Sequence, residues 1–73
     1  EFKVHSNLKR IEQFAFNNCV SLKEIYIPNT IEYMGWYSFR GCFDLIVKCE
    51  ASSKPSKWNG GWAIDVKEVI WGA

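Results

Sequence analysis

The sequence lacks the features that assign many chains to a familiar class of protein. No hydrophobic run approaches the about 18 residues that span a bilayer. Nine Lys and Arg stand against eight Asp and Glu without a run of like charge, and Lys54, Lys57 and Trp58 alone are too few to indicate nucleic acid. The sequence has no glycine-rich phosphate loop, no G-x-S-x-G motif and no glycosylation acceptor. With 48% hydrophobic and 16% aromatic residues, however, the chain is far too apolar to be disordered.

What the chain does contain is an internal repeat. At an offset of 23, Phe16 falls on Phe39, Cys19 on Cys42 and Leu22 on Leu45. Apolar or small residues also recur at the pairs Phe2/Ile25, Val4/Ile27, Leu8/Ile31, Ile11/Met34, Phe14/Tyr37 and Ala15/Ser38, and Glu1 is matched by Glu24. Because the residues between these positions vary freely, we interpret the chain as stacked units that share one interior.

Each unit includes one short segment of alternating hydrophobicity, which is typical of a strand buried on one face. The four segments read FKV, EIYIP, LIVKC and EVIWG, and the last two each follow at an offset of 22. Crossovers of about 18 residues between them predict a sheet of four short parallel strands. The closely set aromatics of IEQFAFNNC and MGWYSFRGC predict short helical or 3₁₀ turns in otherwise irregular crossovers, which makes the expected fold class an α/β repeat.

We expect a single repeat domain with one rung at 1–23, a second at 24–45, and a third strand followed by a tryptophan-rich cap at 46–73. The cap residues are expected to be Trp58, Trp62, Val69 and Trp71, because a terminal rung has to be covered. The alternative for Trp58 and Trp62 is stacking on a sugar ring from the loop around NGG. The residues expected in the core are Phe2, Val4, Leu8, Ile11, Phe16, Cys19, Leu22, Ile25, Ile27, Ile31, Met34, Phe39, Cys42, Leu45, Val47 and Cys49.

The segments IEQFAFNNCVSLKEIYIP (11–28) and MGWYSFRGCFDL (34–45) resemble the leucine-rich repeat of the bacterial surface-protein A (BspA-like) type. The unit of that family reads roughly I-G-x-x-A-F-x-x-C-x-x-L-x-x-I-x-I-P, with Ser38 here in place of the usual Ala. Residues 49–72 resemble the element that commonly closes such arrays. The resemblance implies a right-handed leucine-rich-repeat solenoid on secreted or cell-surface proteins used for attachment. Since Glu1 falls inside a strand without a cap motif, we also expect further repeats N-terminal to it in the parent chain.

The strand residues that alternate with the core positions should point outward. These are Lys3, Tyr26, Lys48 and Ile70, which would form a ladder about 15 Å long across the exposed sheet face. We expect this face to bind a protein, or a glycan, on a host or neighbouring cell, without membrane contact by this segment. Trp36, at a position that is usually polar in the family, is a further candidate contact. The alternatives are an ordinary solvated face and a purely structural cap that shields a longer array.

Catalytic chemistry finds little support in the sequence. His5 is the only histidine, and Glu50, at the matching position two rungs away, should lie roughly 9.6 Å from it. That separation is too long for a dyad, or for a metal site with Cys49, so we expect no enzyme activity, cofactor or metal. Cys19 and Cys42 stack on adjacent rungs, where they could approach disulfide range or remain small buried thiols.

Overall fold

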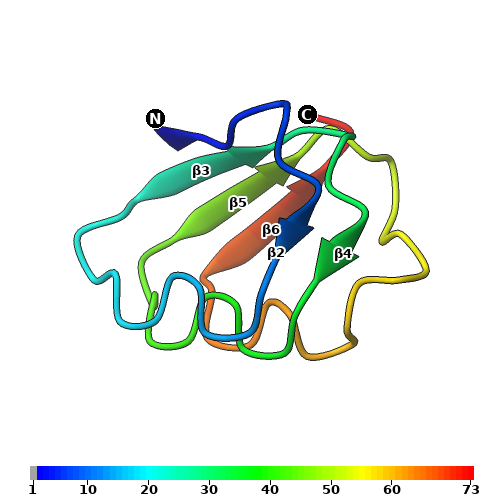
Figure 1. Cartoon of the computed structure of the whole chain (residues 1–73). Helices are drawn as coiled ribbons and strands as arrows, with labels where there is room; N and C mark the ends of the chain where they lie inside the picture. Colours follow the sequence, from blue (N-terminus) through cyan, green and yellow to red (C-terminus); the bar gives the residue numbers. More distant parts are fainter. Residues whose placement is uncertain (1) are drawn as a thin grey trace.

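The structure, a computed structural model, describes residues 2–73, and the place predicted for Glu1 in the first strand lies outside them. The strands are β1 (Phe2–Lys3), β2 (Arg10–Ile11), β3 (Glu24–Ile27), β4 (Tyr33–Met34), β5 (Ile46–Cys49) and β6 (Glu68–Trp71). Four of them form a parallel sheet in the order β1-β3-β5-β6 (Figure 1). The predicted sheet of four short parallel strands is therefore confirmed, and the chain winds through about three turns of a solenoid.

The register of this sheet follows the sequence repeat. Phe2 lies opposite Ile25 in β3, and Ile25 lies opposite Val47 in β5, as the offsets between the repeated segments predict. The same pairing continues from Val47 to Val69 in β6. This register places side chains of the same sheet face directly above one another. The register is strongly specified, because a shift by one residue would turn every apolar side chain of a strand to the other face.

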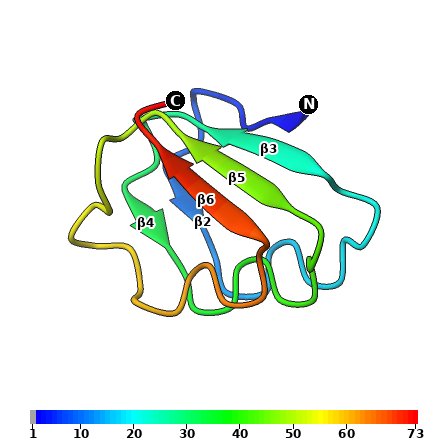
Figure 2. The same ribbon diagram turned by 180° about the vertical axis from the view of Figure 1, so that it is seen from behind.

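A second, smaller parallel pair closes the opposite side of the solenoid. In β2 and β4, Ile11 lies opposite Met34, and an isolated bridge from Met34 to Trp58 continues this pairing into the third turn. β2 and β4 lie in front of the four-stranded sheet in Figure 1 and behind it in Figure 2, so the chain forms two layers. The hydrophobic core lies between the two layers.

The crossovers contain no helix within residues 2–73, which corrects the predicted α/β class to a β-solenoid. Main-chain N–H groups here divide between short local turns and the next turn of the solenoid: Ala15 N–H donates to the carbonyl of Glu12 at 3.2 Å, whereas Phe14 N–H donates to that of Tyr37 at 3.2 Å and Asn18 N–H to that of Arg40 at 2.6 Å. Phe14 and Asn18 have φ of 60° and 59°, and their counterparts in the next turn, Tyr37 and Gly41, have 55° and 79°. A helix cannot pass through such left-handed residues, because the chain reverses its twist there.

Burial follows the prediction in the second and third turns but fails at the open end of the first. Phe2 is 48% and Leu8 is 44% exposed, whereas their counterparts Ile25 and Ile31 are 0% and 2% exposed. The physical reason is position, since within the described residues no turn covers the first one on its outer side. For the same reason, three predicted core residues of the first turn are only half-buried: Phe16, Cys19 and Leu22. The other predicted core residues are buried: Val4, Ile11, Ile25, Ile27, Ile31, Met34, Phe39, Cys42, Leu45, Val47 and Cys49.

At the other end, three tryptophans pack together against the core. Trp58 and Trp62 are buried, with ring centroids 4.9 Å apart, and both lie within 6.0 Å of the half-buried Trp71. The Trp58 indole N–H donates to the carbonyl of Ile31 at 3.1 Å, so its polar atom is satisfied inside the core. This tryptophan cluster, Trp58, Trp62 and Trp71, leaves no ring face of Trp58 or Trp62 open for stacking on a sugar. Val69 lies half-buried in the same terminal strand as Trp71.

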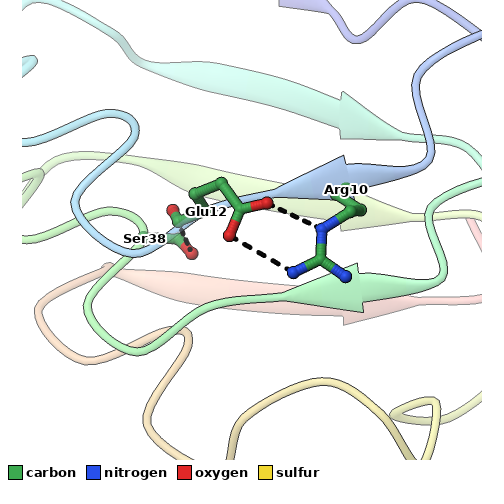
Figure 3. Close-up of polar contacts among 3 residues, drawn as sticks. All are labelled: Arg10, Glu12 and Ser38. Carbon is green, nitrogen blue, oxygen red and sulfur yellow. Dashed lines mark hydrogen bonds and ion pairs between the residues drawn. The ribbon is translucent and has the colours of Figure 1, made fainter.

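Polar contacts tie the first two turns together beside β2 (Figure 3). The buried Ser38 hydroxyl donates to the Gly35 carbonyl at 2.7 Å and lies 3.3 Å from the Glu12 carbonyl of the preceding turn. The Glu12 carboxylate accepts from Arg10 Nε at 2.7 Å and from Nη2 at 3.4 Å. This hydrogen bond lowers the pKa of Glu12 and raises that of Arg10, although both side chains are exposed and the pair contributes little to stability.

Candidate binding surface on the four-stranded sheet

The four outward residues predicted to form a ladder lie in register across the larger sheet. Lys3 of β1 is opposite Tyr26 of β3, Tyr26 is opposite Lys48 of β5, and Lys48 is opposite Ile70 of β6. Lys3 is exposed, Tyr26 and Lys48 are half-buried, and Ile70 is 37% exposed. Strands about 4.8 Å apart give this row the expected length. We call these four residues the sheet-face ladder.

The side chains of the ladder hold one another and their neighbours in place. Lys3 Nζ lies 5.2 Å from the centre of the Tyr26 ring, a cation–π contact. Lys48 Nζ lies 3.3 Å from Glu24 Oε1 in the adjacent strand, and both side chains are partly screened from solvent. The row therefore offers an ammonium group near an aromatic ring at one end and an aliphatic side chain at the other. Such a surface can make contacts of more than one kind with a partner.

A half-open pocket of about 460 Å³ adjoins the ladder at the carboxyl ends of β1 and β3. Its lining includes Lys3, Tyr26, His5 and Glu50. His5 Nδ1 accepts from the Asn7 N–H at 3.1 Å, and one oxygen of Glu50 accepts from a main-chain N–H at 2.8 Å. His5 and Glu50 thus share a pocket, yet each has its own local partner, and no hydrogen bond joins them within residues 2–73.

The described side chains considered for metal or nucleic-acid binding are mostly separated from one another or engaged in local contacts. Throughout the part of the chain that the structure describes, no three His, Cys, Asp or Glu side chains come close enough to hold a metal ion. Lys54 Nζ donates to the carbonyls of Pro55 and Trp58, at 3.2 and 2.8 Å, and so closes its own loop. With Trp58 buried and Lys54 engaged, only Lys57 of the basic and aromatic group remains free to contact a nucleic acid.

The three cysteines are free thiols. Cys42 Sγ donates to the carbonyl of Phe16 at 3.1 Å, so this thiol links adjacent turns without a disulfide to Cys19. Burial raises the pKa of Cys42, and it raises the pKa of Cys49 to about 12. Both groups are therefore neutral at physiological pH, and neither has the thiolate character of a nucleophile.

Trp36 is exposed, as its unusual place in the repeat predicted, but it lies apart from the sheet-face ladder. Its ring contacts Phe14 and Tyr37, at centroid distances of 5.6 and 4.5 Å, and all three follow β2 or β4 in the crossovers. One signal of this grouping was present in the sequence, since Phe14 and Tyr37 occupy equivalent positions of the repeat. Their outward direction depends on a left-handed backbone, which the repeat alone does not indicate.

The comparison with known families identifies the repeat. The sequence profile of the BspA type Leucine rich repeat region (6 copies) matches residues 1–59, which is most of the chain. The chain belongs to this family. No curated protein and no solved structure matches it.

Membership of the BspA-type leucine-rich repeats supports a class of function. Leucine-rich repeats generally mediate protein binding, and solenoids of this kind are generally non-catalytic. The BspA-type family is generally surface-associated in bacteria. Within residues 2–73, no helix is long and apolar enough to cross a membrane.

Proposed function

We propose that the chain is a non-catalytic binding module whose sheet-face ladder docks against a protein on a host or neighbouring cell. The observation that carries this proposal is the register of Lys3, Tyr26, Lys48 and Ile70 across four hydrogen-bonded strands. A sheet fixed by main-chain hydrogen bonds presents its outer side chains at constant spacing, so a partner meets them without having to order them.

The dimensions of the chain set the strength of this interaction. Its two largest extents are 25 and 22 Å, so one face offers less than the about 800 Å² that each partner buries in a standard interface. The segment alone should therefore bind weakly, with a Kd of about 1 μM or higher. Any further repeats stacked on the first turn would extend the same face and raise the affinity. An extracellular role in adhesion is part of this proposal.

The test selects peptide ligands from a phage-displayed library on the wild-type chain and measures them on variants of the ladder. Lys3→Glu alters an exposed side chain and should leave the unfolding midpoint nearly unchanged, whereas Ile70→Ser removes a partly covered side chain, so its affinity is compared per folded molecule. Each is expected to weaken the dominant ligands about tenfold, the usual cost of losing one important contact. Lys57→Glu, an equal charge reversal in an exposed loop, is the matched control and should retain binding. Unchanged affinity for both ladder variants would refute the proposed surface.

A second candidate function is structural, and the tryptophan cluster favours it. Trp62 stacks edge-on against Phe39 of the second turn at 6.1 Å, which is how a covering layer would contact the last turn of the core. If the segment serves as a cap, Trp62→Ala should expose the core and cause melting or aggregation. The affinity of each folded molecule for its ligand should then be unaffected. The experiment distinguishes the two functions: a binding surface predicts variants that lose affinity but keep their stability, whereas a cap predicts variants that lose stability but keep their affinity.

A further inference from the structure

A group of aromatic and aliphatic side chains lies on the crossovers, away from the sheet-face ladder, and all of them except the half-buried Tyr37 are exposed. It consists of Phe14, Trp36, Tyr37 and Ile64, and we call it the crossover aromatic cluster. Phe14 and Tyr37 are stacked at 6.0 Å with an interplanar angle of 14°, and Trp36 stands nearly edge-on to both, at 67° and 61°. Trp36 is 44% and Ile64 is 40% exposed. Three turns of the solenoid thus contribute to one apolar surface, a feature that often marks an interaction site.

The backbone beneath this cluster is held in a conformation that aromatic residues rarely adopt. Phe14 has φ of 60° and Tyr37 has φ of 55°, both in the left-handed region. A bulky side chain is an outlier there, and such outliers concentrate at functional sites. The chain makes this unfavourable choice twice, at equivalent positions of successive turns, and in both cases the ring joins the surface cluster.

The Trp36 ring packs over Gly61 of the third turn. A Cβ atom at this position would lie 2.7 Å from Trp36 Cδ1 and 3.0 Å from Ile64 Cδ1, too close for either to stay where it is. The adjacent Gly60 has no atom within 4 Å of the corresponding point. Trp36 therefore lies in a place that only a glycine leaves open, and its orientation is fixed by packing.

A cation lies beside the cluster, and the nearby Asp65 carboxylate is engaged by the Gly41 N–H at 3.0 Å. The Arg40 guanidinium lies 5.8 Å from the centre of the Tyr37 ring, and no ion pair involves Arg40 within residues 2–73. The exposed carboxylate of Glu12, close by in sequence, is bound by Arg10. A cation next to Trp and Tyr rings is the composition that dominates binding energy at protein interfaces. The unpaired guanidinium selects for a partner with a carboxylate.

We propose that the crossover aromatic cluster is a second docking site, and that it takes a protein segment with an apolar side chain next to a carboxylate. The apolar side chain would pack against Trp36 and Phe14, and the carboxylate would pair with Arg40. This site lies outside the sheet-face ladder, so it does not depend on the proposed function. A sugar ring on the same rings and a second copy of the chain are the competing occupants, and the experiment distinguishes them.

The test follows the indole N–H signal of Trp36 by NMR in the intact chain. Trp36→Phe assigns the signal by removing it. The probe is the blocked peptide Gly-Leu-Glu-Leu-Gly, compared with its charge-reversed counterpart Gly-Leu-Lys-Leu-Gly. The acidic peptide should shift the Trp36 signal saturably in the millimolar range, about fivefold more tightly than the basic one, as expected for one exposed ion pair. The Trp58 signal, from an indole bonded inside the core, should not move.

Three variants locate the effect. Gly61→Ala should displace the Trp36 ring and weaken the acidic peptide while the chain stays folded, and Gly60→Ala is its matched control with no expected change. Arg40→Glu should reverse the preference between the two peptides. The proposal is overturned if neither peptide shifts the Trp36 signal, or if both shift it equally. It is also overturned if millimolar glucose or galactose moves the signal more than the acidic peptide does, or if the signal depends on protein concentration alone, as a self-associating chain would show.

Discussion

Leucine occupies the same position in the first two turns, and truncating it in each should have very different costs. Leu45 is fully buried, whereas Leu22 is half-buried because none of the residues that the structure describes form a turn over the first one. Leu→Ala in a closed core costs about 3 kcal/mol, and at a half-open site about 1 to 1.5 kcal/mol, since less surface leaves water on folding and less cavity remains. A domain of this length has a stability of about 7 kcal/mol, so both variants should remain folded.

Urea denaturation followed by tryptophan fluorescence measures the difference. With a slope near 1 kcal/mol per M, the midpoint should fall by about 3 M in Leu45→Ala and by about 1 M in Leu22→Ala. The slope itself should be unchanged, because neither variant alters the surface exposed on unfolding. Equal shifts in the two variants would refute the reasoning, since they would mean that the first turn is as fully covered in solution as the second.

Three further predictions concern close packing, reactivity and the tryptophan cluster. Gly35→Ala should destabilise the chain by about 2 kcal/mol or more, as overpacking does, because the added Cβ would lie 2.3 Å from a main-chain nitrogen of the preceding turn. Gly60→Ala should be neutral in the same urea titration. Equal stabilities of the two variants would contradict this prediction. At pH 8, iodoacetamide should modify the half-buried Cys19 first and leave Cys49 unmodified, because the pKa of Cys49 is raised to about 12 and its thiol stays protonated. Mass spectrometry measures the two rates of modification, and comparable rates would contradict the prediction. Trp58→Phe should lower the free energy of unfolding by about 2 kcal/mol through the loss of its buried hydrogen bond and ring volume, and a thermal melt unchanged from wild type would rule this out.

The sheet was predictable because its signal lies in the spacing of residues. Ile25, Val47 and Val69 face one interior, so the sequence has to return an apolar residue to the same position in every turn. That requirement determines strand number, order and register together. The same reasoning places Tyr26 and Lys48 on the opposite face, since side chains alternate along a strand.

What could not be predicted depends on contacts between turns. The exposure of Phe2 arises from what lies beside its turn, whereas the repeat describes only the turn itself. The absence of helix from residues 2–73 follows from the left-handed Phe14 and Tyr37, whose residue types give no hint of positive φ. The seat of Trp36 over Gly61 joins residues of two different turns, which no local pattern connects. Sequence reasoning therefore found Trp36 as a candidate contact and missed the surface to which it belongs.

The stacking of turns gives the molecule a simple rule of growth. Within residues 2–73, each strand of the larger sheet pairs only with the strands beside it, and the tryptophan cluster contacts Phe39 and the carbonyl of Ile31 in the second turn. A tandem duplication of residues 24–45 would thus insert one strand into each of the two sheets and lengthen both by about 4.8 Å without disturbing either terminus. The length of the solenoid could then be changed in fixed increments by duplicating the short stretch of gene that encodes one repeat.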